Sequence, residues 1–234
     1  YQKLHMLRET FTGVPFIALT ATATPRVRTD ILHQLGMVNT KWFLSSFNRN
    51  NLKYQVHPKK GKASTEDLSI IIQQQFRNKT GIVYCLSKKD CDDTAKEMRK
   101  AGIKAKAYHA GLGREERTAT QDSWLQDKTK VVCATIAFGM GIDKPDVRFV
   151  IHQSIPQSIE GYYQESGRGG RDGGPCLCLL LYTHQDIIRM RKLIDLGEGD
   201  MASRRTHMNN LDQMVKYCED MSECRRVMQL QYFG

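Results

Sequence analysis

GIVYCLSKKDCDDTAKEMRKAGIKAKAYHAGLGREERTATQDSWLQDKTKVVCAT, residues 81–135, is the stretch of this chain that decides its fold. Short apolar runs alternate there with polar stretches in which apolar residues recur at helical spacing. The pattern predicts strands at 81–85, 103–109 and 130–135, separated by helices at 88–100 and 114–125. Strands that are apolar throughout and alternate with helices form parallel sheets with right-handed crossovers.

The same alternation continues outward from this stretch. Upstream it predicts a buried strand from Val14 that ends in a Thr-rich turn, a helix from Thr24 and Pro25 to Gly36, two short strands within 42–56, and a helix at 66–76. Downstream it predicts strands at 147–152 and 176–182 around a helix at 158–165, then only helices, at 187–194, 211–217 and 223–230, with a linker at 197–203. We therefore predict the α/β class, with a parallel sheet covered by helices on both faces and followed by a helical segment.

The charge of the chain favours a polyanionic partner. The 234 residues include 35 Lys and Arg against 25 Asp and Glu, a formal net charge of +10. Such a balance is typical of nucleic-acid-binding proteins, although a basic surface that only maintains solubility is the alternative. No apolar run approaches the roughly 20 residues of a membrane span, so we expect no membrane partner.

The seven cysteines indicate a reducing compartment, because their number is odd and their spacing forms no disulfide framework. Cys85, Cys133, Cys176 and Cys178 lie in strand-like apolar runs, where cysteine packs as a small hydrophobic residue. We expect Cys218 to pack in a helix in the same way.

YYQESGRGGRDGG, residues 162–174, carries the sharpest chemical signal. Arg168 and Arg171 stand three residues apart on a Gly-rich turn that follows a predicted helix. Glycines let the backbone approach a ligand, and the planar fork of arginine matches phosphate oxygens. The arrangement suits an arginine finger that reaches a γ-phosphate held elsewhere. A disordered RGG-like RNA-binding patch is the alternative, disfavoured by the ordered pattern on both sides.

Two further segments carry weaker signals. In residues 133–152 a strand ends at Thr135, at the carboxyl edge where open α/β sheets bind ligands, and a Gly-Met-Gly turn then leads to Asp143. The hydroxyl and glycine amides suit phosphates and the carboxylate suits a ribose hydroxyl, although a simple loop is the alternative. In ALTATAT, residues 18–24, clustered hydroxyls suit a relay between two sites, or only a strand end with a helix cap.

In chain order, residues 18–24, 133–152 and 162–174 resemble motifs III, V and VI of superfamily 2 helicases. Residues 81–91 resemble motif IV, and YHAGL, residues 108–112, resembles the neighbouring signature. Together with FNRNNLKY and ECRR they resemble the RecQ family of ATP-dependent DNA helicases over nearly the whole chain. The resemblance implies the end of a first RecA-like lobe at 1–45, a second RecA-like lobe at 46–183, and the helical start of a zinc-binding domain at 184–234.

The resemblance also implies a function for the intact protein. It would bind ATP with Mg²⁺ and couple ATP hydrolysis to 3′-to-5′ unwinding of DNA. Its partners would be single-stranded DNA and forked or junction DNA. It would act in the nucleus during repair and recombination. The implied roles are catalysis for Arg171 as the finger, Arg168 and Gln164; nucleotide binding for Asp143, Gly141 and both arginines; DNA binding for Ser87, Lys88, Thr135, Asn48 and Arg49; coupling for Thr20 and Thr22; and zinc binding for Cys224.

Three departures from the family pattern limit what this chain does alone. No GxxxxGK[ST] motif and no Asp-Glu-Ala-His box occurs, so we expect part of a larger protein that is inactive without its phosphate cradle and magnesium carboxylate. Gly169 stands where the family usually has Ala, which should loosen the turn. Cys218 and Cys224 alone do not make a four-ligand Zn²⁺ site. A non-catalytic nucleic-acid-binding module and an RNA helicase of the same superfamily are the alternatives.

Overall fold

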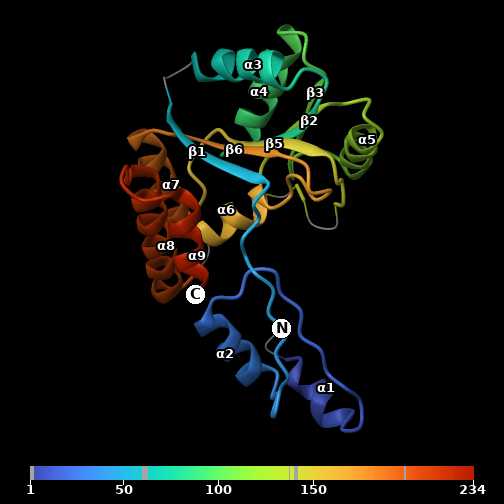
Figure 1. Cartoon of the computed structure of the whole chain (residues 1–234), viewed down its shortest axis with the longest axis vertical. Coiled ribbons are helices and arrows are strands. Elements are labelled where there is room, and N and C mark those ends of the chain that lie inside the picture. Colours follow the sequence, from blue (N-terminus) through green and yellow to red (C-terminus); the bar gives the residue numbers. More distant parts are fainter. Residues whose placement is uncertain (1–2, 60–62, 137, 140–141, 198) are drawn as a thin grey trace. The chain divides into compact units, whose positions relative to one another are not determined.

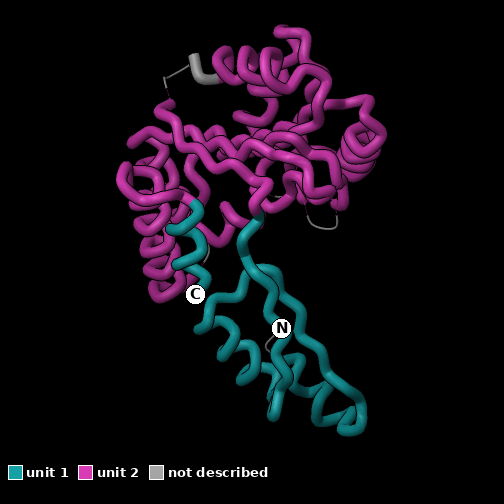
Figure 2. The backbone as a smooth tube through the Cα atoms, viewed as in Figure 1, with its two compact units in different colours: residues 1–49, 226–234 teal, residues 50–225 magenta. Residues whose placement is uncertain are grey.

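A computed structural model of the chain describes residues 3–59, 63–136, 138–139, 142–197 and 199–234 (Figure 1). The chain divides into two compact units, one of residues 1–49 with 226–234 and one of residues 50–225 (Figure 2). Each unit is described by itself, and the larger one contains the sheet.

The larger unit is built on a six-stranded sheet in the order β1-β6-β5-β2-β4-β3, and every pairing is parallel. The strands are β1 Leu52–Pro58, β2 Thr80–Tyr84, β3 Ala105–Tyr108, β4 Val131–Ala134, β5 Val147–His152 and β6 Cys176–Tyr182. The predicted parallel sheet is therefore confirmed, and the predicted strands of this unit lie within two residues of these bounds. Side chains of alternating strand residues point to opposite faces, so each face needs its own apolar cover.

Helices cover both faces of this sheet (Figure 1). The connecting helices are α3 Ala63–Gln75, α4 Lys88–Lys100, α5 Arg114–Leu125 and α6 Ile159–Ser166. One apolar cluster joins the sheet to Leu68 of α3 and Met98 of α4, while the cluster on the other face contains Trp124 of α5. The prediction of an α/β fold with helices on both faces is confirmed.

The C-terminal segment is helical, as predicted, with α7 His184–Leu196, α8 Met201–Glu219 and α9 Arg225–Phe233. Helix α8 is longer than the sequence suggested, and the predicted linker at 197–203 is wrong in its last three residues. Asp200 is the N-cap, because its carboxylate accepts the Ser203 N–H at 2.8 Å. No helix among the described residues is long and apolar enough to cross a bilayer.

The smaller unit differs most from the sequence prediction. It contains α1 His5–Thr10, which was not predicted, and α2 Pro25–Gln34, which begins at the predicted Thr24 cap. The strand predicted from Val14 is wrong: the segment has no strand, and Leu19 is 91% exposed. The first strand predicted within 42–56 is absent as well. A strand needs a hydrogen-bonded neighbouring strand, and none of the described residues before Leu52 belongs to a strand.

Candidate functional site

The arginine loop, residues 167–174 between α6 and β6, is fixed at the amino ends of the strands. The Gly170 N–H donates to the Val147 carbonyl at 2.9 Å, and the Asp172 N–H donates to the Pro145 carbonyl at 3.2 Å. Val147 is the first residue of β5, so these hydrogen bonds tie the loop to that end of the sheet. A disordered RGG patch does not fit these contacts.

Asn51, at the entrance to β1, closes the arginine loop from the other side. Its side-chain Nδ2 donates to the carbonyls of Gly170 at 2.7 Å and Gly174 at 2.8 Å, and its own carbonyl accepts the Cys176 N–H at 2.9 Å. Sequence reasoning missed this residue and selected Asn48 and Arg49 from the same motif. The only signal was its place in FNRNNLKY.

Replacing Asn51 by Ala should destabilise the larger unit, because two loop carbonyls lose their donor. We expect the free energy of unfolding to fall by about 1–3 kcal/mol for two hydrogen bonds. Urea unfolding measures the change, and Asn50→Ala is the matched control because Asn50 is exposed. Equal stability of the two variants would contradict the assigned role of Asn51.

Gly169 lies in a closely packed part of the arginine loop, and the expected loosening stays a prediction. It is buried, and a Cβ built on it would lie 2.2 Å from Cys176 Sγ. The small residue is needed here because the loop backbone packs directly on the first residue of β6.

Both predicted arginines contact the segment that follows β4. Arg171 donates from a terminal nitrogen to the Ile142 carbonyl at 3.0 Å and to Asp143 Oδ1 at 2.9 Å. Arg168 donates to the Gly139 carbonyl. A Cβ at Gly139 would overlap the Arg168 guanidinium, so glycine permits this approach. The structure thus brings together the arginines and Asp143, which the sequence assigned to one nucleotide site.

The two arginines differ in how freely they can move. The Arg171 side chain is 35% exposed and its partner Asp143 is 84% exposed, whereas Arg168 has a buried Nε. An ion pair that faces water is weak, so Asp143 holds Arg171 only loosely, and the arginine would release this carboxylate and the Ile142 carbonyl when it turns to a phosphate. Gly141, which the sequence assigned to the nucleotide, lies outside the described residues.

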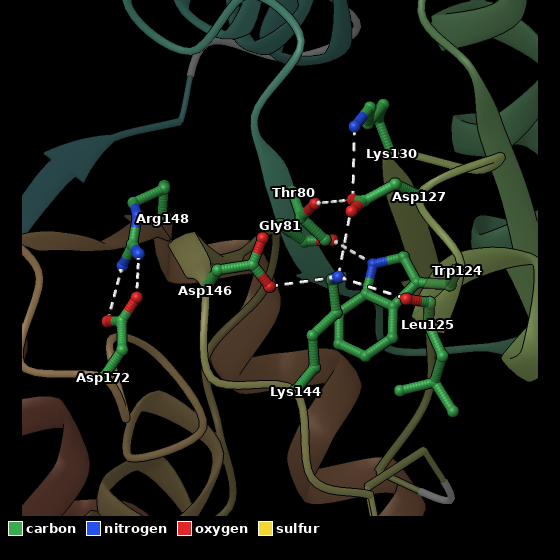
Figure 3. A network of polar contacts seen from close by, with 10 residues as sticks. All are labelled: Thr80, Gly81, Trp124, Leu125, Asp127, Lys130, Lys144, Asp146, Arg148 and Asp172. Atoms are coloured by element: carbon green, nitrogen blue, oxygen red, sulfur yellow. Dashed lines mark hydrogen bonds and ion pairs between the residues drawn. The ribbon is translucent and has the colours of Figure 1, made fainter.

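Lys144 anchors the segment that carries Asp143 (Figure 3). Its side chain is 5% exposed, and its Nζ lies 3.0 Å from Asp146 Oδ1 and 3.4 Å from Asp127 Oδ1. Nζ also lies 3.4 Å from the Leu125 carbonyl and 5.7 Å from the centre of the Trp124 ring. A buried ammonium with two carboxylates and an aromatic ring fixes the backbone next to Asp143 against the end of α5.

Arg148 of β5 holds the arginine loop through Asp172 (Figure 3). The hydrogen bond from Arg148 lowers the pKa of Asp172 below its ordinary value, so the carboxylate stays ionised at neutral pH. Lys144 and Arg148 thus add separate anchors to two segments that are also bonded to each other.

The predicted DNA-binding residues of the larger unit lie at the opposite edge of the sheet. Ser87 and Thr135 follow the neighbouring parallel strands β2 and β4 at their carboxyl ends. The Ser87 hydroxyl accepts the Asp90 N–H at 3.1 Å and caps α4, and Lys88 begins that helix exposed to solvent. Gln164 lies on the exposed side of α6.

The remaining predicted residues belong to the smaller unit. The Asn48 side-chain oxygen accepts from Arg226 at 2.8 Å, and the Arg49 carbonyl accepts from the same guanidinium at 2.6 Å. The Thr22 N–H donates to Thr20 Oγ1 at 3.4 Å. Within this unit these residues hold local structure, and their DNA-binding and coupling roles stay predictions.

Two family models match the chain. Residues 62–173 match the helicase conserved C-terminal domain, and residues 184–234 match the RecQ zinc-binding domain. The chain belongs to the RecQ family. It is 53% identical to the RecQ-like DNA helicase BLM of Xenopus laevis and 52% identical to the RecQ-like DNA helicase blm-1 of Caenorhabditis elegans, over 100% of its own length. It spans only 17% and 24% of these two relatives.

Solved structures share the fold of this RecQ-family chain at low sequence identity. Dbp5 of S. cerevisiae bound to RNA and ADP BeF3 matches 87% of this chain and 49% of its own, with a TM-score of 0.63 and 20% identity. The E. coli DEAD-box protein SrmB matches 64% of this chain and 88% of its own, with a TM-score of 0.54 and 21% identity. These similarities concern the fold alone.

The cysteines of the RecQ zinc-binding segment differ in exposure. Cys218 is buried in α8, as expected, and burial raises the pKa of its thiol to about 12, whereas Cys224 is exposed. Zinc binds the thiolate, so Cys218 is a poor ligand in this structure. The described residues include no group of three or more His, Cys, Asp or Glu side chains that could hold a metal ion. They therefore do not make a Zn²⁺ site by themselves.

One cysteine in seven should react rapidly with a thiol reagent. Only Cys224 is exposed, and the six others are buried. We expect one fast phase in labelling of the folded chain with an aromatic disulfide, and its loss in Cys224→Ser. Cys218→Ser is the matched control and should keep the fast phase. A second fast thiol would contradict the described packing.

Proposed function

We propose that the full-length protein is an ATP-dependent DNA helicase that translocates 3′-to-5′ in the nucleus during repair and recombination. The observation that carries the proposal is the fixed arginine loop, with Arg171 close enough to bond Asp143 and exposed enough to leave it. Membership of the RecQ family supports the same conclusion. ATP with Mg²⁺ supplies the free energy, and forked or junction DNA is the proposed substrate.

The described residues would serve the reaction by binding and positioning. Arg171 would neutralise charge that develops on the γ-phosphate, and Asp143 would bind the ribose hydroxyls once the arginine has turned away. Arg168 would hold the Gly139 backbone in place. No GxxxxGK[ST] motif is present in this sequence, so the phosphates would be held by residues outside it.

ATP hydrolysis by the full-length protein and by this chain tests the proposal. We expect DNA-stimulated hydrolysis only for the full-length protein. A full-length protein that binds DNA without hydrolysing ATP would indicate the non-catalytic module. Separation of matched DNA and RNA duplexes, each with a 3′ single-stranded tail, distinguishes a DNA helicase from an RNA helicase. Faster separation of the RNA duplex would overturn the proposed substrate.

Lys88 should contribute one phosphate contact to binding of single-stranded DNA. In a plot of log affinity against log salt concentration, each neutralised phosphate contributes a slope of about −0.7. Lys88→Gln should therefore make the slope less steep by about 0.7. Lys100→Gln is the matched control, because Lys100 is exposed at the other end of α4 and pairs with Glu97. Equal slopes for both variants would remove Lys88 from the proposed site.

Cys224 is proposed as one ligand of a structural Zn²⁺ completed by residues other than those described. Zinc content of the full-length protein, measured by mass spectrometry, should fall in Cys224→Ser. Unchanged zinc content would reject this ligand.

A further inference from the structure

One buried tyrosine connects the carboxyl edge of the sheet with the arginine loop. Tyr84 is the last residue of β2, three residues before Ser87, and is 4% exposed. Its hydroxyl donates to the Phe138 carbonyl at 3.1 Å, and the Phe138 N–H donates to the Thr135 carbonyl at 3.1 Å. The phenol therefore contacts the segment that leaves the carboxyl end of β4 at Thr135.

The same phenol lies close to Arg168. Tyr84 bonds the carbonyl of Phe138, and Arg168 bonds the carbonyl of the next residue, Gly139, so both side chains hold the same short piece of backbone. Burial raises the pKa of Tyr84 above its ordinary value, and the positive charge of Arg168 opposes that rise, in line with this arrangement. Arg168 has a buried Nε without an acceptor, although a terminal nitrogen bonds Gly139. A phenolic oxygen that donates one hydrogen bond can still accept another. The Tyr84 oxygen thus keeps an acceptor position, and the arginine held at the neighbouring carbonyl keeps a donor.

The ring that carries this hydroxyl is held rigidly. It stacks on the His152 ring, with centroids 5.0 Å apart and planes at 23°. His152 Nε2 lies 2.7 Å from Glu165 Oε2, and Glu165 is on α6, three residues before Arg168. The ends of β2 and β5 are in this way connected to the helix that leads into the arginine loop. Packed and bonded groups thus link both strand ends to the helix that precedes Arg168.

We propose that the Tyr84 hydroxyl couples DNA binding at the carboxyl edge to the position of Arg168. DNA bound at Thr135 moves the Phe138 carbonyl, which the phenol bonds, and with it the neighbouring Gly139 carbonyl that accepts from the Arg168 guanidinium. Tyr84 is a positioning residue, since it acts through Arg168. The proposal rests on the proposed helicase function.

Tyr162 is the matched control for this proposal. It is fully buried and contacts the same His152 ring, with centroids 4.8 Å apart. Its hydroxyl has no hydrogen-bond partner in the structure. Tyr84→Phe and Tyr162→Phe each remove one buried hydroxyl beside the same imidazole, but only the first removes a hydrogen bond to the Phe138 carbonyl.

The test measures ATP turnover of the full-length protein with and without single-stranded DNA. In Tyr84→Phe the ratio of stimulated to basal turnover should fall roughly tenfold, as expected for loss of one buried hydrogen bond, while the dissociation constant for DNA stays within about twofold. In Tyr162→Phe the ratio should equal that of the wild type. In an Arg168→Ala background, Tyr84→Phe should have no further effect, because the hydroxyl acts through that arginine.

Three results would overturn the coupling. A wild-type ratio in Tyr84→Phe means that the hydroxyl transmits nothing. An equal fall in both tyrosine variants means that the effect is general core packing. A further tenfold fall in the Arg168→Ala background means that Tyr84 acts elsewhere. If the wild type shows no DNA-stimulated turnover, the proposed function itself is overturned. The wild-type measurement alone separates this outcome from the three results above.

Discussion

ATP hydrolysis by the full-length protein should fall by a factor of roughly 10³–10⁵ when Arg171 is replaced by Ala, the range found for arginine fingers in phosphoryl transfer. The DNA dissociation constant should stay within a few-fold. The physical reason is differential binding: a guanidinium that stabilises charge only in the transition state raises the rate rather than the affinity for ATP. The contacts of Arg171 fit this role, because its one ion pair among the described residues is with the exposed Asp143.

Two further variants make the result specific. Arg171→Lys should rescue poorly, since an ammonium keeps the charge but loses the planar fork. Arg77→Ala is the control, because Arg77 is an exposed arginine in the loop after α3. Arg168→Ala should also reduce the rate, through the position of Gly139 rather than direct contact with phosphate. If Arg171→Ala keeps most of its hydrolysis rate but loses DNA binding, the loop is a nucleic-acid patch and the finger is misassigned.

The second large effect is expected at the adjacent Gly169 and Gly170. Gly170 has φ +53°, and a Cβ there would lie 2.4 Å from the Gly174 carbonyl oxygen and 2.5 Å from Asn51 Nδ2. An alanine at this position would have to adopt a left-handed backbone conformation, and its Cβ would also clash with the main chain. We expect Gly170→Ala to reduce the free energy of unfolding by about 2–5 kcal/mol, the sum of the two costs.

Gly169→Ala should cost less, about 1–3 kcal/mol, because its added Cβ meets the end of the Cys176 side chain rather than backbone. Urea unfolding of the single variants and of their combinations with Cys176→Ala separates the two cases. Removing the thiol should restore much of the stability of Gly169→Ala and none of that of Gly170→Ala. Rescue of both variants, or of neither, would contradict the packing described for the loop.

The sequence predicted the sheet well because the central strands β2, β4 and β5 and the strand β6 are largely apolar on both faces. Helix α4 also carries a local signal, because Ser87 and Asp90, three residues apart, form a reciprocal capping box. The prediction of a strand from Val14 failed because the apolar residues of this segment predict burial, whereas none of the described residues pairs with it. A hydrophobic pattern indicates that a residue is buried, but it does not show which segment buries it.

The sequence predicted residues of the candidate site but not the residues that hold them in place. Arg168, Arg171 and Asp143 belong to recognisable motifs, and the structure brings them together. Asn51 and Tyr84 were not predicted as site residues, because their hydrogen bonds join residues 54 to 123 positions apart. A local pattern carries no information on such bonds, and Tyr84 reads only as one more apolar strand residue.

The pairing of the first strand with the last has a consequence for synthesis on the ribosome. Leu52 of β1 lies beside Cys176 of β6, and Asn51 bonds two loop carbonyls 119 and 123 residues later. Contacts this distant along the chain form late in folding, because a long loop must close first. Until β6 has left the ribosome, a nascent chain therefore lacks the hydrogen bonds and strand pairing that hold the arginine loop in place. Their working geometry arises only when nearly the whole sheet has been translated.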